Sequence, residues 1–278
     1  MLLNITASAT HKHPATDLGY LLGKHPERWQ QKPLSFGTAH VFYPKISPEC
    51  CTATLLLDID TTREMRNRRL DHQGRNANVQ AGFDQYVTDR AYVAGSLLAS
   101  AVAKVFGGAM NGKCPQRPEL VEAVWPLEIE LAAVSVRGSA DLLHEVFEPL
   151  GYQLSYQQVP LDERFPSWGD SPYYHLRLRN TCTLQRAVQH LYVLLPILDN
   201  RKHYFVKEAE VEKLLAKAKD WLATHPKREF ITRRYLRHRR NLQRDALAEL
   251  DATTPPTATE KSSEAILARK TPLHEQRH

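Results

Sequence analysis

The sequence lacks the patterns that mark membrane, secreted and disulfide-rich proteins. Its 278 residues include only four cysteines, and no C-x-x-C pair could hold zinc or support redox chemistry. No run of about 18 apolar residues occurs, so no membrane-spanning helix is expected. The N-terminal residues show no charged lead before a long apolar core, so no secretory signal is expected. These absences predict a cytoplasmic protein with reduced thiols.

The overall composition is that of an ordinary globular protein. Hydrophobic residues make up 42% and charged residues 24%, which excludes wholesale disorder. The length fits one large domain or two small ones. The formal net charge is +6, and a modest excess of this kind points to a specific partner only where it is concentrated.

Apolar periodicity predicts alternating strands and helices, and therefore an α/β to α+β fold with mixed sheets and packed helices. Strands are expected at residues 2–6, 34–43, 51–60, 127–136, 152–159 and 173–179. Helices are expected at 17–24, 92–106, 139–150 and 183–198, and a long basic helix near the C-terminal end. The Arg-rich residues 61–82 show little periodicity and are expected to form a loop.

The same pattern predicts the domain organisation. Residues 1–250 are expected to form one domain, with candidate lobes at 1–120 and 126–250 on either side of a Pro-rich connector. Residues 251–278 are rich in Thr, Pro, Ser and Glu, and are expected to be a disordered linker.

Two short motifs resemble catalytic signatures, and both are weak. Residues 107–113 (GGAMNGK) fit the start of a phosphate-binding loop, but Cys114 stands where a magnesium-binding hydroxyl is needed and the segment follows a helix. A glycine helix stop is the favoured interpretation. Residues 274–278 (HEQRH) match the zinc motif H-E-x-x-H, but they follow the expected linker and no third ligand comes after them. Neither motif is assigned a catalytic role.

Other enzyme signatures are missing from the sequence. There is no G-x-S-x-G nucleophile elbow, no K-x-D-G ligase lysine and no D-x-G-x-G methyl-donor loop. Asp58 and Asp60 end a strand, but without a third ligand nearby a solvated strand end is favoured over a metal site. No catalytic residue and no metal ligand is predicted, so the motifs favour a binding module.

The strongest local signal is the basic segment 227–244, which contains eight Lys and Arg residues against one acid, Glu229. On one continuous helix, a stripe would be formed by Arg233, Arg237, Arg240 and Arg244. Arginine side chains suit phosphates and carboxylates, so RNA or an acidic protein surface is the implied partner. A solvated basic helix without a partner is about equally compatible with this pattern.

Several runs together resemble one family, the N-terminal half of the bacterial RNA 3′-terminal ribose 2′-O-methyltransferases. These enzymes are partners of an RNA-repair kinase–phosphatase–ligase. The resembling runs occur in order along residues 1–250: DLGYLL (17–22), LSFGTAHVFYP (34–44), DRAYVA (89–94), FEPLGY (147–152), PLDERFPSWGDS (160–171), HLYVLLPILDNRKHYFV (190–206) and EFITRRYLRHRR (229–240). WGDS and ITRRYLRHRR are the most specific of these runs.

The resemblance implies a non-catalytic module that binds the RNA ligase component in a hetero-oligomer and activates its adenylation and RNA sealing. The C-terminal half of the family would carry S-adenosylmethionine and a divalent metal, and residues 272–277 (PLHEQR) resemble its beginning. No cofactor is expected in residues 1–250. Partner or RNA contacts are expected from Asp170, Lys202, Arg233, Arg234, Arg237, Arg240 and Arg244.

Two alternatives to ligase activation remain open from the sequence. The first is an RNA-binding module that presents the repaired 3′ end to the methyltransferase half, and it predicts salt-sensitive RNA affinity that depends on the 233–244 stripe. The second is an independent enzyme using residues 107–113, which predicts ATP hydrolysis that the substitution Lys113→Ala abolishes.

Overall fold

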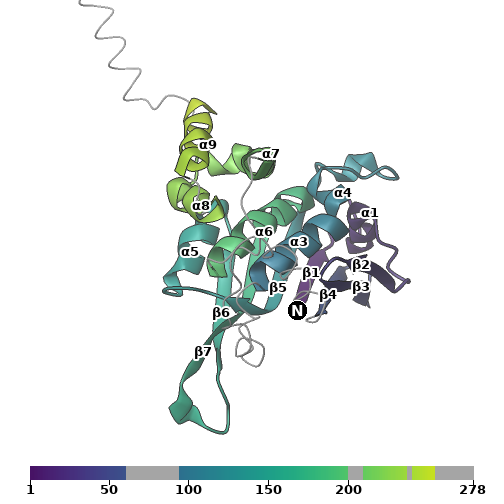
Figure 1. Ribbon diagram of the computed structural model, residues 1–278. Helices are drawn as coiled ribbons and strands as arrows, with labels where there is room; N and C mark the ends of the chain where they lie inside the picture. Colours follow the sequence, from purple (N-terminus) through teal and green to yellow (C-terminus); the bar gives the residue numbers. More distant parts are fainter. Residues whose placement is uncertain (61–93, 200–208, 237–239, 254–278) are drawn as a thin grey trace, which may run out of the picture.

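One seven-stranded antiparallel sheet carries the whole architecture (Figure 1). The computed structural model describes residues 1–60, 94–199, 209–236 and 240–253. The strand order is β2-β3-β4-β1-β5-β7-β6, and every neighbouring pair is antiparallel. The strands are β1 (Leu2–Ser8), β2 (Gln30–Leu34), β3 (Gly37–Ile46), β4 (Cys50–Ile59), β5 (Val124–Ser135), β6 (Gln153–Pro160) and β7 (Asp170–Thr183).

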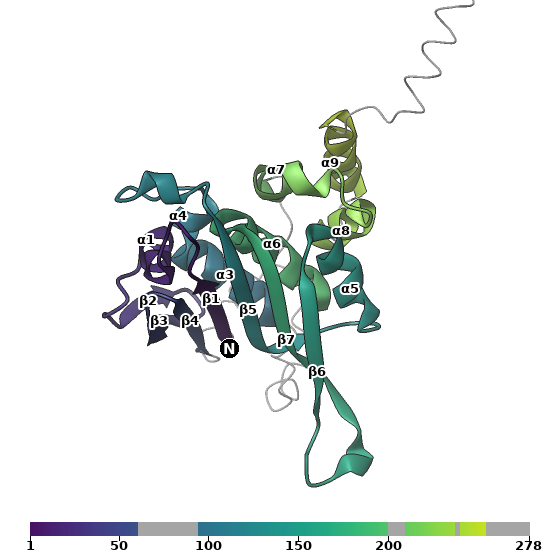
Figure 2. The same cartoon turned by 180° about the vertical axis from the view of Figure 1, so that it is seen from behind.

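The helices lie mainly on one face of this sheet (Figures 1 and 2). α6 packs on β5 and β7, α3 packs on β5 and α6, and α5 packs on β6. The α-helices are α1 (Leu18–Leu22), α3 (Ala94–Val105), α4 (Gly107–Met110), α5 (Asp141–Phe147), α6 (Leu184–Asp199), α7 (Ala209–Leu222), α8 (Arg228–Tyr235) and α9 (Arg240–Thr253). Short 3₁₀ turns lie at Ala15–Asp17, Pro118–Leu120, Glu148–Leu150 and Pro166–Trp168. No described helix is long and apolar enough to span a bilayer.

Strict alternation along the central strands separates the two faces of the sheet. In β1, Leu3 and Ile5 are fully buried against the helical layer, whereas Asn4 and Thr6 point to the other face. β5 repeats the pattern with Ile129 buried between two glutamates. One face is therefore the core and the other is polar.

Helix α3 approaches α6 unusually closely, as its small residues predict. Gly95 donates its N–H to the Asp199 carboxylate over 3.1 Å. A Cβ at Gly95 would lie 2.6 Å from the Leu195 carbonyl oxygen, so a larger residue there would push the helices apart. This contact holds α3 against α6.

The predicted fold class is confirmed, and the sheet is entirely antiparallel. β1 pairs with β5, so the candidate lobes 1–120 and 126–250 share a single sheet. The helix predicted to stop at residues 107–108 ends at Val105, and Gly107 begins the further short helix α4. The predicted loop at 61–82 and most of the predicted linker 251–278 lie outside the described residues.

The prediction of a single long basic helix near the C-terminal end is also wrong. α8 ends at Tyr235, and Leu236 leaves helical geometry with φ −98° and ψ 35°. Gln243 of α9 donates side-chain hydrogen bonds to the carbonyls of Arg233 and Leu236, which a continuous helix would have satisfied with its own backbone. Packing explains the break, because two shorter helices bury both Ile231 and Leu250 completely.

Candidate docking surfaces

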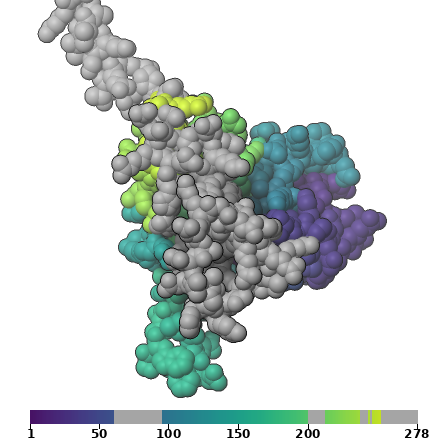
Figure 3. All heavy atoms as spheres, in the orientation of Figure 1, coloured from purple at the N-terminus to yellow at the C-terminus, as the bar shows by residue number. Residues whose placement is uncertain are grey.

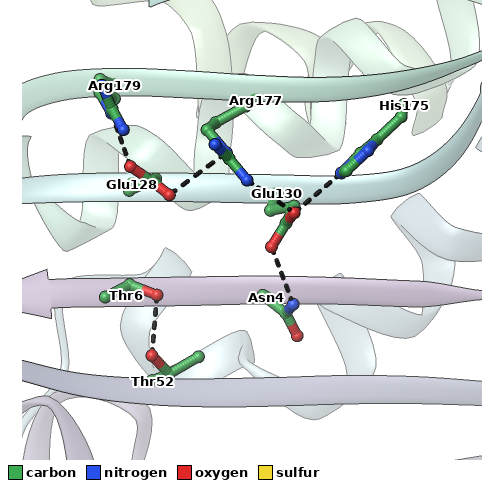
Figure 4. A network of polar contacts seen from close by, with 8 residues as sticks. All are labelled: Asn4, Thr6, Thr52, Glu128, Glu130, His175, Arg177 and Arg179. Atoms are coloured by element: carbon green, nitrogen blue, oxygen red, sulfur yellow. Dashed lines mark hydrogen bonds and ion pairs between the residues drawn. The ribbon is translucent and has the colours of Figure 1, made fainter. Parts of the chain in front are cut away.

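The polar face of the sheet, which no described helix covers, carries a row of cross-strand ion pairs (Figures 2 and 4). Arg177 of β7 lies 3.1 Å from Glu130 and 3.4 Å from Glu128, both on β5. His175 and Arg179 pair with the same two glutamates. The positive charges of Arg177 and Arg179 are thus matched within the sheet, and these ion pairs act mainly to fix strand register.

Glu130 is the centre of this row. Burial raises its pKa, but hydrogen bonds from Asn4, Arg177 and His175 outweigh burial and hold the pKa below its ordinary value. The carboxylate therefore stays charged at neutral pH. Because these arginines are paired with glutamates, this row of ion pairs offers no free cation to bind a phosphate.

An exposed aromatic pair lies toward the opposite edge of the same face. Trp29 stacks on Phe42 of β3 with ring centroids 5.0 Å apart and planes 7° from parallel. Phe42 faces Thr54, which pairs with Asn4, so the stack belongs to the polar face. The Trp29 side chain is 59% exposed.

The second exposed surface is the end of the β6–β7 hairpin, residues 159–172, called the hairpin end below. It extends beyond the helical layer and the rest of the sheet (Figures 1 and 3). Two backbone hydrogen bonds close its chain reversal. The Leu161 N–H donates to the Gly169 carbonyl at 3.1 Å, and the Trp168 N–H donates to the Phe165 carbonyl at 2.9 Å. Gly169 has φ +80°, which an L side chain rarely adopts.

Polar side chains hold the hairpin end in shape. Asp162 accepts the Arg164 backbone N–H at 2.9 Å and an Arg164 guanidinium hydrogen bond at 3.1 Å. These two bonds lower the pKa of Asp162 below its ordinary range. Ser171 donates its hydroxyl to the Val159 carbonyl at 2.6 Å, which closes the neck of the segment. The turn is therefore ordered by its own residues.

The predicted stripe on one continuous helix is wrong, because the helix break after Tyr235 leaves Arg233 on α8 and puts Arg240 and Arg244 on α9. Arg233 is exposed and pairs with Glu229 at 3.1 Å. Arg234 is half-buried, donates to the Ile197 carbonyl at 2.9 Å and lies over the Phe230 ring at 4.4 Å. These contacts hold the Arg234 side chain against α6 and within α8.

The other predicted contact residues divide into two groups. Asp170 lies in the hairpin end and is exposed, as a contact residue should be. Lys202 and Arg237 lie outside the described residues, and the side chains of Arg240 and Arg244 in α9 are likewise outside the description. The structure thus brings none of the predicted arginines together with Asp170 among the described side chains.

The segment 107–113 does not have the geometry of a phosphate-binding loop. The N–H groups of Asn111, Gly112 and Lys113 already bond to carbonyls of residues 107–109, so they cannot surround a phosphate. Lys113 is exposed, and the Cys114 thiol is 3.4 Å from the Tyr20 carbonyl. The H-E-x-x-H residues lie outside the described part of the chain. Within the described part, no group of three or more His, Cys, Asp or Glu side chains could hold a metal.

A polar cluster that the sequence did not indicate lies where α6 and α7 meet β7, beside a cavity of about 270 Å³. His190 is buried, its Nδ1 is 3.1 Å from the Tyr152 hydroxyl, and its ring meets Trp221 edge to face. Burial, Arg186 and His225 lower the pKa of His190 to about 3, and burial raises the pKa of Cys182 to about 11. A neutral imidazole and a protonated thiol indicate a structural cluster rather than an activated nucleophile.

These features define a class of protein: an antiparallel α+β fold whose exposed aromatic side chains lie on an open sheet face and on a projecting hairpin end. Comparison with known protein families identifies the particular family. The family model described as "RNA repair, ligase-Pnkp-associating, region of Hen1" matches residues 1–251. The chain belongs to this family, and the resemblance found in the sequence is confirmed.

A solved structure supports the fold. The chain is similar to one in the "Structure of the Pnkp1/Rnl/Hen1 RNA repair complex", with a TM-score of 0.56 and 11% identity. The match covers 97% of this chain and 62% of that chain, so this chain spans less than two thirds of its length. At this identity the likeness concerns the fold alone. A comparison with curated proteins returned no match.

Proposed function

We propose that this chain binds the RNA ligase component of a bacterial RNA-repair kinase–phosphatase–ligase and activates the adenylation and RNA sealing carried out by that ligase. The observation that supports it is the family match over residues 1–251, whose description is association with ligase and Pnkp. In this proposal the chain itself performs no chemistry. Methylation of the terminal RNA ribose, with S-adenosylmethionine and a divalent metal, belongs to other residues of a longer RNA-repair protein.

The physical mechanism is a shift in the population of ligase conformations. A ligase that rarely occupies its adenylation-competent state is activated by a partner that binds this state preferentially. A preference of about 3 kcal/mol raises a rare state roughly a hundredfold. The continuous sheet and close α3–α6 packing suit such a partner, because a preformed surface loses little conformational entropy on binding.

The test is auto-adenylation of the cognate repair enzyme with labelled ATP, with and without the purified chain. We expect the chain to increase the ligase-bound label by one to two orders of magnitude. The substitution Lys113→Ala should leave this increase unchanged, because Lys113 belongs to no phosphate site. A folded chain that forms a complex with the enzyme but leaves adenylation unchanged would contradict the proposal.

The same protein preparation also tests the RNA-binding alternative. Titration with a single-stranded RNA at several salt concentrations should show only weak affinity, because the described arginines of β7 and α8 have partners within the chain. Tight, strongly salt-dependent RNA binding without ligase stimulation would favour the alternative.

A further inference from the structure

Exposed apolar surface is concentrated at the hairpin end. Of the eight large hydrophobic side chains exposed in the described part of the chain, four lie between residues 159 and 168. They are Val159, Leu161, Phe165 and Trp168, with exposures of 37%, 57%, 47% and 60%. A cluster of this kind on a projecting segment is typical of an interaction site rather than of ordinary surface.

The two aromatic rings form a preformed wedge. Phe165 and Trp168 stack with centroids 4.7 Å apart and planes 15° from parallel. Backbone hydrogen bonds close the turn on both sides of them, and the Arg164 guanidinium lies 5.9 Å from the Phe165 ring centroid. Trp and Arg are the residue types that contribute most to protein interfaces. Because the wedge is already ordered, binding orders little more.

Charge indicates which kind of partner fits the wedge. The hairpin end contains three acids, Asp162, Glu163 and Asp170, against the single base Arg164, so its formal charge is −2 while the whole chain carries +6. Arg164 is paired with Asp162, which leaves Glu163 and Asp170 to set the local field. A polyanionic RNA is repelled by such a surface, whereas a protein pocket with a basic rim is attracted.

We propose that the hairpin end is the element that docks on the ligase-bearing partner protein, inserting Phe165 and Trp168 into an apolar pocket rimmed by basic side chains. This inference rests on the proposed function, because it assigns the surface through which the chain reaches the ligase. The family description names association with the ligase but assigns no surface to it. We assign that surface to the hairpin end because Phe165 and Trp168 form an ordered, exposed stack beside acidic residues.

The experiment measures the affinity of the full chain for the intact repair enzyme by calorimetry, alongside auto-adenylation. Phe165→Ala/Trp168→Ala should weaken binding about thirtyfold or more. Trp29→Ala is the matched control, because Trp29 is 59% exposed but lies on the sheet face, and its affinity should stay within twofold of the original. The reversals Glu163→Lys and Asp170→Lys should weaken binding and reduce the salt dependence of the affinity.

The auto-adenylation measurement distinguishes failure of the proposed docking site from failure of the proposed function. If the unmodified chain stimulates the ligase and the double variant stimulates it equally at equal concentrations, the docking site is overturned and the proposed function stands. Stimulation that returns only at high concentrations of the double variant supports docking. Unchanged ligase affinity together with loss of RNA binding in the double variant overturns the protein partner in favour of RNA stacking. If the unmodified chain neither binds nor stimulates the enzyme, the proposed function itself fails.

Discussion

The hairpin end and the helical layer of α6 and α8 use polar and aromatic residues in opposite ways. In the helical layer, His190 is buried between Tyr152 and Trp221, and Arg234 is half-buried on the Ile197 carbonyl and the Phe230 ring. In the hairpin end, Phe165 and Trp168 stack mainly on each other and remain about half exposed. In the helical layer these side chains pack within the fold. In the hairpin end the two rings remain accessible to a partner.

The comparison teaches that charge density in a sequence does not tell which side chains are held within the fold. The segment 227–244 has the highest density of arginine, yet Arg234 is half-buried on the Ile197 carbonyl and Arg233 pairs with its helix neighbour Glu229. The hairpin end has a single arginine and a formal charge of −2, yet it presents the most concentrated exposed apolar surface among the described residues. An interaction site is better recognised by which groups lack an internal partner.

The largest expected effect concerns the buried histidine of the helical layer. Its folded pKa of about 3 lies below the ordinary 6.5, so only the unfolded chain takes up the proton as the pH falls through this window. The stabilising contribution is complete above pH 6.5 and is lost below it, by about 1.4 kcal/mol per pH unit. Urea unfolding between pH 7.5 and 4.5 should therefore show a loss of about 3 kcal/mol from His190 alone.

The substitution His190→Asn should reduce this pH dependence, because it removes the titrating group while keeping a hydrogen-bonding partner for Tyr152. His144→Asn is the control, since His144 is on the surface of α5 beside Glu148. Over the same range the hairpin end should keep its ion pair, because the hydrogen bonds from Arg164 hold the pKa of Asp162 below its ordinary 3.8. Equal slopes for the original chain and His190→Asn would contradict the assignment.

A smaller effect separates two neighbouring arginines of α8. Arg234→Ala removes hydrogen bonds to the carbonyls of Ile197 and Arg137 and the contact with Phe230, and should lower the free energy of unfolding by about 2 kcal/mol. Arg233→Ala removes only an exposed pair with Glu229 and should cost about 0.5 kcal/mol or less. Chemical denaturation of the two variants checks this, and equal losses would show that Arg234 has no internal role.

The smallest effect is expected where the exposed surface is greatest. Phe165→Ala/Trp168→Ala should change the free energy of unfolding by only about 1 kcal/mol, because both rings are about half exposed and stack mainly on each other. Thermal unfolding followed by far-UV circular dichroism measures it, with Trp29→Ala as reference. A loss of several kcal/mol would mean that the hairpin end supports the fold instead of serving a partner.

The sequence by itself determined the local structure of most of the described chain. Apolar residues predicted the strand at 2–6, where Leu3 and Ile5 are buried, and the helix at 92–106, which α3 largely confirms. The resembling motifs identified the family without any structural information. Local periodicity is enough for these inferences, because strand and helix geometry repeat every two and 3.6 residues.

Only the tertiary structure decided the strand order, the break after Tyr235 and which side chains are free for partners. The guanidinium of Arg234 bonds to the carbonyl of Arg137, 97 positions away, and no periodicity in the sequence reports such a pairing. Likewise, Phe165 and Trp168 in a turn are as compatible with burial as with exposure until the hairpin is seen to extend past the helical layer. Exposure depends on what the rest of the chain places nearby, and that is a property of the folded molecule.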